Sequence, residues 1–189
     1  MQAEADELVA LLDLHHLLAK IGRPIRVGSS AMGLMVRRDI DITVTCDRLD
    51  GAAIEAFANF GAHLMRQVEY VGTVKFRNDT GSWNGEPDKY PDGLYLWLSV
   101  QMPNKAAWTV DIWMVDEPER QPDLTHLKIL LPRLIDTNRA IILQIKHDLL
   151  ASADHGPTKV ASALIYEAVL DHGVGTSEEF VQWHLNHIP

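Results

Sequence analysis

The stretch that decides the fold runs from Ile25 to Val44 and reads I-R-V-G-S-S-A-M-G-L-M-V-R-R-D-I-D-I-T-V. Its first residues predict a short apolar strand that ends at Gly28 and Ser29. After a short helical turn, Asp39 and Asp41 flank one apolar residue in a second predicted strand. Because side chains alternate along a strand, both carboxylates lie on one face, with Cα atoms about 6.5–7 Å apart.

This pair of carboxylates predicts a metal site. Two carboxylates at such a separation repel each other unless a cation lies between them. Hard divalent cations prefer oxygen ligands, so Asp39 and Asp41 are candidate ligands of one or two such ions. The glycine-serine turn just before them can direct backbone N–H groups toward an anion such as a phosphate. Together these features indicate metal-dependent phosphoryl or nucleotidyl transfer.

The rest of the chain predicts a mixed α/β core followed by helices. The hydrophobic pattern predicts helices over residues 4–20 and 51–60, and strands or extended runs over 63–77, 94–102 and 107–115. Residues 78–93 are turn formers almost throughout and predict a long loop. From Leu124 onward the pattern is helical, over 124–153 with a break at Pro132, then 158–172 and about 176–186. We therefore expect a core of residues 1–122 and a helical C-terminal region of residues 123–189 packed on it.

Composition narrows the function classes. The chain has 189 residues, 47% of them hydrophobic, and a formal net charge of −9. Non-specific nucleic-acid binding relies on a cationic surface, so this charge argues against bulk nucleic-acid binding, although not against one nucleic-acid end at a metal site. Cys46 is the single cysteine and excludes an intrachain disulfide. The acidic N-terminus predicts no signal peptide, and no apolar run is long enough to span a membrane, so we expect a cytoplasmic protein.

A third carboxylate links these motifs to a known family. Val110, Asp111 and Ile112 lie in the predicted strand A-W-T-V-D-I-W-M-V. An apolar-Gly-Ser turn, then Asp-apolar-Asp, then a strand aspartate, in this order, resembles the nucleotidyltransferase superfamily, whose fold is that of the DNA polymerase beta palm. The resemblance covers about residues 25–115. It implies an α/β (α+β) fold with a mixed β-sheet and flanking helices.

The resemblance also implies roles for the matched residues. Gly28 and Ser29 would hold a nucleoside triphosphate such as ATP. Asp39 and Asp41 would bind two Mg²⁺ ions, and Asp111 would bind one of them and help deprotonate the attacking hydroxyl. Ser30 could add a phosphate contact or only cap the next turn.

Lys146 is the candidate contact in the C-terminal helix I-L-Q-I-K-H-D-L-L. It lies seven residues after Arg139 and so shares a helix face with it and with Leu143 and Leu150. A cation on an otherwise apolar face is costly unless it faces a cleft. In several relatives of the superfamily, including the abortive-infection nucleotidyltransferase toxins, a helical lysine lies against the triphosphate, and the stretch around Lys146 is distantly similar to that pattern.

For one further lysine and several aromatic residues, the sequence allows either a place in the site or a place elsewhere in the fold. Lys75, in V-K-F-R, could point toward the site or to solvent. The strand tryptophans Trp97, Trp108 and Trp113 are expected in the core. Trp83, like Tyr90, lies in the turn-rich loop and could stack on a base or an acceptor.

The sequence thus predicts a Mg²⁺-dependent nucleotidyltransferase. It would move a nucleoside monophosphate from a nucleoside triphosphate to a hydroxyl of a small-molecule or protein acceptor. Two alternatives stay open at this point: a catalytically inactive nucleotide-binding or regulatory module of the same fold, and a toxin-type nucleotidyltransferase that acts on RNA.

Overall fold

The computed structural model describes residues 1–152 and 160–187 and divides into two compact units after Ile129. The first unit contains all the described strands and the helices up to α5 (Pro122–Leu130), which ends at the boundary. The second unit is helical in its described residues. Helix α5, predicted as part of the C-terminal region, therefore belongs mainly to the first unit. The packing of the C-terminal region on the core stays a prediction.

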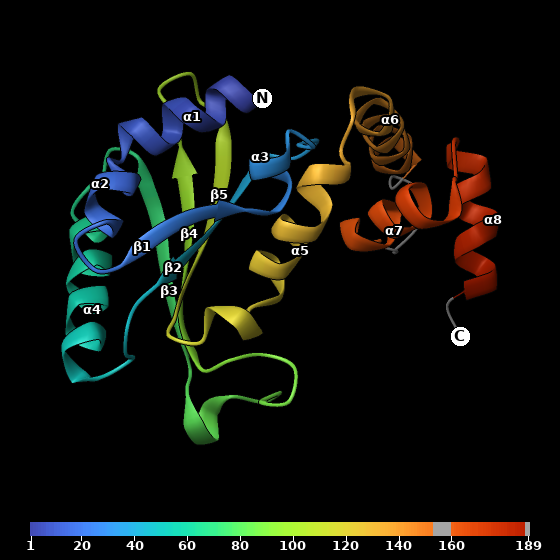
Figure 1. The fold of residues 1–189 in the computed structure, drawn as a ribbon. Helices are drawn as coiled ribbons and strands as arrows, with labels where there is room; N and C mark the ends of the chain where they lie inside the picture. Colours follow the sequence, from blue (N-terminus) through green and yellow to red (C-terminus); the bar gives the residue numbers. More distant parts are fainter. Residues whose placement is uncertain (153–159, 188–189) are drawn as a thin grey trace. The chain divides into compact units, whose positions relative to one another are not determined.

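The first unit is built on one five-stranded mixed sheet (Figure 1). Its strands are β1 (Arg23–Val27), β2 (Asp39–Thr45), β3 (Val71–Asp79), β4 (Gly93–Gln101) and β5 (Ala107–Val115), in the order β1-β2-β5-β4-β3. The β2 and β5 strands are parallel, whereas the other neighbouring pairs are antiparallel. The mixed sheet with flanking helices confirms the predicted fold class.

One face of this sheet carries the core. The helices α1 (Gln2–Leu11), α2 (Leu14–Leu18) and α4 (Gly51–Met65) supply buried leucine and phenylalanine side chains to it. Every second residue of the central strands packs against these helices. Among these strand residues, Ile40, Trp108 and Val110 are almost fully buried. Because side chains alternate along a strand, the residues between them lie on the opposite face. Trp108 is thus a core residue, as predicted.

Two predicted helix boundaries differ from the structure. The helix predicted over residues 4–20 is two helices, because Asp13 adopts a left-handed backbone with φ of 50° that also lets Leu12 and Leu14 both point into the core. The helix predicted over residues 51–60 continues past that range, so Gly61 lies inside α4. A Cβ built there would lie 3.5 Å from a methyl carbon of Leu96, so the small residue allows the helix to approach the sheet closely.

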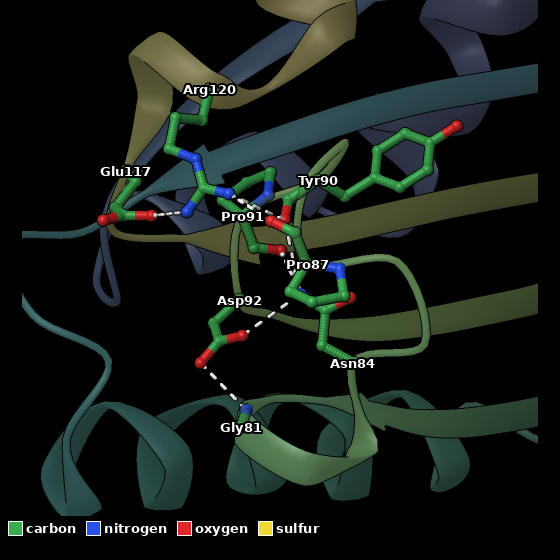
Figure 2. A network of polar contacts seen from close by, with 8 residues as sticks. All are labelled: Gly81, Asn84, Pro87, Tyr90, Pro91, Asp92, Glu117 and Arg120. Carbon is green, nitrogen blue, oxygen red and sulfur yellow. Dashed lines mark hydrogen bonds and ion pairs between the residues drawn. The ribbon is translucent and has the colours of Figure 1, made fainter.

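The long loop between β3 and β4 is held by polar contacts (Figure 2). It contains one 3₁₀ turn, η1 (Gly81–Trp83). The Asn84 side chain donates to Asp92 Oδ1 at 3.1 Å, and Gly81 N–H donates to Asp92 Oδ2 at 2.9 Å. Arg120, in the 3₁₀ turn η2 (Pro118–Arg120), donates to the Pro87 carbonyl and ties the loop to the segment after β5.

In its described part, the second unit contains the 3₁₀ turn η3 (Leu131–Arg133) and the helices α6 (Asp136–Ser152), α7 (Ser162–His172) and α8 (Ser177–His187). Arg133, at the end of η3, joins this turn to α7 through an ion pair with Asp171 at 2.6 Å. The first residues of the helix predicted over 158–172, up to Lys159, lie outside the described residues. Among the described helices, none combines the length and the apolar character that a membrane span needs.

Candidate active site

The face of the sheet opposite the core brings the three predicted carboxylates together. Asp41 in β2 lies directly opposite Asp111 in β5 in the parallel register. Asp39, two residues before Asp41, lies opposite Thr109 on the same face. All three carboxylate side chains are partly exposed. Residues that are 70 positions apart in the sequence thus form one acidic cluster on neighbouring strands.

This cluster fits hard divalent cations. Like charges directly opposite each other on adjacent strands destabilise a sheet, and a bound cation offsets that repulsion. No three described His, Cys, Asp or Glu side chains are arranged as a preformed metal cage. Mg²⁺ does not need one, because it usually takes one or two carboxylates and completes its shell with waters and substrate phosphates. The oxygen-only donor set of Asp39, Asp41 and Asp111 matches that preference.

Gly28 is placed against the cluster by its backbone. It directly follows β1, whose last residue Val27 pairs with Asp41. Its φ of +62° is left-handed, and a Cβ added there would lie 3.1 Å from Asp41 Cγ and closer still to one carboxylate oxygen. Only glycine combines this conformation with this approach at low cost. The turn that is predicted to bind phosphate therefore touches the predicted metal ligand directly.

The two serines after Gly28 have different surroundings in the short helix α3 (Gly28–Met32). Ser29 is partly exposed. Ser30 is buried, and its hydroxyl donates to the Val27 carbonyl at 3.2 Å and accepts from Arg26 Nε at 3.1 Å. These contacts give Ser30 a structural role. Phosphate binding by Gly28, Ser29 and Ser30 stays a prediction.

Tyr95 is a site residue that the sequence analysis missed. Its hydroxyl donates a hydrogen bond to Asp111 Oδ1. Burial, followed by the hydrogen bond and the negative charge of Asp111, raises the pKa of Tyr95, so its hydroxyl stays protonated as a donor. The ring is packed at 4.7 Å from the Trp113 ring, and the Arg77 guanidinium lies 5.0 Å from its centroid. Tyr95 is therefore held in place to orient the third carboxylate.

For the nucleotide transfer that the sequence predicts, we expect Tyr95→Phe to lower the turnover number by roughly 10- to 100-fold while leaving the KM for the nucleotide unchanged. The substitution removes one hydrogen bond to a charged group, which is worth roughly 1.5–3 kcal/mol, and keeps the ring contacts. Steady-state kinetics separates kcat from KM. Tyr90→Phe, in the exposed loop, is the matched control and is expected to leave both constants unchanged. An unchanged kcat in Tyr95→Phe would exclude a positioning role.

Two of the tryptophans expected in the core lie instead on the face of the sheet that carries the three carboxylates, which we call the site face. Trp97 and Trp113 are partly exposed, because in β4 and β5 they alternate with the buried residues. Lys75 is exposed on the same face, opposite Trp97, with its Nζ 4.4 Å from the centroid of that ring. Large apolar rings usually mark the core, but the strand period alone places Trp113 on the same face as Asp111 and Trp97 on the face opposite its leucine neighbours in β4.

Lys146 lies in α6 of the second unit, and its side chain is 93% buried there. Its ammonium donates to the Tyr166 hydroxyl at 3.4 Å and lies 5.6 Å from the centroid of that ring. Its contact with a triphosphate stays a prediction.

The strand order, the register and the acidic cluster define a nucleotidyltransferase fold of the DNA polymerase beta type. Solved structures share this fold. A structure of the Cid1 poly(U) polymerase bound to MgATP matches with a TM-score of 0.62 at 19% identity, over 92% of this chain and 51% of that chain. A cytoplasmic RNA terminal U-transferase matches with a TM-score of 0.56 at 18% identity, over 92% and 50% of the two chains.

A third match is Cid1 in complex with its short product ApU, with a TM-score of 0.55 at 19% identity, over 90% of this chain and 49% of that chain. The present chain thus spans about half the length of these solved structures. No protein-family model matches the chain, and no curated protein matches it by sequence. At these identities the likeness establishes the fold.

Proposed function

We propose that this chain is a Mg²⁺-dependent nucleotidyltransferase that moves a nucleoside monophosphate from a nucleoside triphosphate to a hydroxyl. The observation that carries the proposal is the register of the sheet, which puts Asp41 opposite Asp111 with Asp39 on the same face. The contact of Gly28 with Asp41 supports it further, because the predicted phosphate turn and the predicted metal ligands are adjacent. The solved neighbours with this fold include proteins described as polymerases and terminal transferases.

In this proposal each residue has a defined task. The turn at Gly28 and Ser29 would hold the triphosphate. Asp39 and Asp41 would hold two Mg²⁺ ions, and Asp111 would bind one of them. When bound, such ions stabilise the entering and leaving oxygens. Asp111 accepts the proton of the acceptor hydroxyl, whose oxygen forms a bond to the α-phosphorus. The bond from the α-phosphorus to its bridging oxygen breaks, and pyrophosphate leaves.

We further propose that the acceptor hydroxyl belongs to the end of an RNA chain. The matched neighbours are described as a poly(U) polymerase and an RNA terminal U-transferase. This acceptor replaces the small molecule or protein expected from the net charge of −9, and the expectation against nucleic-acid binding finds no support among these neighbours. One RNA end needs only local contacts, which an acidic chain can still provide.

Incubation with a labelled RNA oligonucleotide and each of the four nucleoside triphosphates tests the proposal. The expected result is lengthening of the RNA in the presence of Mg²⁺ and none with the metal chelated. The rival function is an inactive nucleotide-binding module of the same fold. Nucleotide binding without any transfer to RNA, to a small molecule or to a protein would favour that module.

A further inference from the structure

One row of side chains crosses four strands of the site face. The register places in this row, in order from β2 to β3, Asp41, Asp111, Trp97 and Lys75. Directly opposite residues on neighbouring strands share a face, so the four side chains leave the sheet on the same side. Neighbouring strands are about 4.8 Å apart, which puts Lys75 about 10 Å beyond Asp111. The row therefore leads from the carboxylates to an aromatic ring and then to a cation.

Lys75 is the available cation of this row. Its side chain is exposed, and within the described residues no carboxylate pairs with it, whereas the neighbouring Arg77 is paired with Asp79 at 2.7 Å. The Lys75 ammonium lies over the Trp97 ring instead, at 4.4 Å from the centroid. Such a contact at an exposed site is weak, about 0.5–1 kcal/mol, so a phosphate can draw the flexible lysine away from the ring.

Three chemical groups of one nucleotide match three successive members of the row. In the proposed function the acceptor hydroxyl lies at Asp111. A base attached to the same sugar is a flat apolar ring, for which the partly exposed Trp97 on the next strand offers a stacking surface. The phosphate on the far side of that sugar is an anion, for which Lys75 on the following strand offers a positive charge.

We propose that this row is the binding site of the terminal nucleotide of a single-stranded RNA acceptor. The base stacks on Trp97, the phosphate pairs with Lys75, and the 3′ hydroxyl points to Asp111. Stacking accepts any base, because every base has a π face. The site therefore recognises the end of a strand and not its sequence. The inference rests on the proposed function for the placement of the hydroxyl.

Fluorescence anisotropy with an end-labelled single-stranded RNA tests this site. Binding is measured without nucleotide and with the metal chelated, over a series of salt concentrations. Trp97→Ala is expected to weaken binding by roughly 5- to 150-fold with an unchanged salt dependence, because it removes one stacked base. Lys75→Ala is expected to make the fall of log affinity with log salt shallower by about 0.7, because it removes one phosphate contact to a single strand.

The exposed loop supplies matched controls. Trp83→Ala and Lys89→Ala remove the same residue types from the β3–β4 loop and are expected to leave affinity and salt slope unchanged. Trp97→Phe keeps an aromatic ring and is expected to retain most of the affinity, which tests the role of the ring even if Trp97→Ala does not fold. Weaker binding in Trp83→Ala with normal binding in Trp97→Ala would place the RNA on the loop and overturn the inference.

The binding readout separates the inference from the proposed function. A wild-type protein that does not bind RNA, or unchanged affinity and salt slope in both Trp97→Ala and Lys75→Ala, would overturn the inference. If the wild type also lengthens RNA, the proposed function survives that result. If the two variants bind RNA as expected but the wild type transfers no nucleotide to it, the proposed function fails while the RNA-binding row stands.

Discussion

Replacing Asp39 and Asp41 together by Asn is expected to lower the rate of nucleotide transfer by about 10³-fold or more. Both substitutions keep the shape of the side chain and remove its charge, so the proposed metal site loses the charge that would hold two Mg²⁺ ions. The ions contribute several kcal/mol to stabilising the transition state, and each 1.36 kcal/mol is a factor of ten in rate. The rate of RNA lengthening at saturating nucleotide measures the loss.

The same variant is expected to be at least as stable as the wild type in the absence of metal. Its substitutions remove the repulsion between Asp41 and Asp111, which lie directly opposite each other. Thermal unfolding with the metal chelated therefore separates a lost site from a lost fold. Asp88→Asn, in the exposed loop, is the matched control and is expected to keep full activity. Normal transfer by the Asp39→Asn and Asp41→Asn double variant would contradict the site assignment.

Gly28→Ala is expected to lower transfer by about 10²-fold and to destabilise the protein by roughly 2 kcal/mol. The left-handed φ of +62° alone costs an alanine about 1–2 kcal/mol. The added Cβ also meets the Asp41 carboxylate, which must move away from its place beside Asp111. A displacement of about 1 Å at a reacting centre is enough for a loss of this size in rate.

Substitutions at two other glycines distinguish the effect of backbone strain from the effect of the contact with Asp41. Gly81 has a left-handed φ of +53° with nothing within 4 Å of an added Cβ, and Gly85 has open space around it as well. Gly81→Ala is therefore expected to lower the free energy of unfolding by about 1 kcal/mol without loss of transfer. Gly85→Ala is expected to change neither the stability nor the rate of transfer. Urea unfolding and RNA lengthening measure both effects. If Gly28→Ala loses no more activity than Gly81→Ala, the contact with Asp41 has no part in the reaction.

The two carboxylates of β2 could be placed on one face from the sequence because their signal is local. Asp39 and Asp41 are separated by one residue, so strand alternation alone puts them on one face. The glycine before them lies at the end of a short apolar strand, where a turn is expected. Asp111 could be added only through the resemblance to a family, because nothing in the sequence states which strand lies next to β2.

The parts that sequence reasoning missed depend on register and tertiary packing. Tyr95 contacts Asp111 only because β4 pairs antiparallel with β5, and Lys75 meets Trp97 only through the register of β3 with β4. The break at Asp13 arises because packing favours a left-handed residue over a continuous helix. None of these pairings has a local signature in the chain.

The most direct test of the metal-and-nucleotide site is isothermal titration of nucleoside triphosphates into the wild type and into the Asp39→Asn and Asp41→Asn double variant, with Mg²⁺ and with the metal chelated. We expect Mg²⁺ to strengthen nucleotide binding to the wild type and to have no effect on binding to the double variant. Equal strengthening by Mg²⁺ in both proteins, or no nucleotide binding to the wild type in either condition, would contradict it.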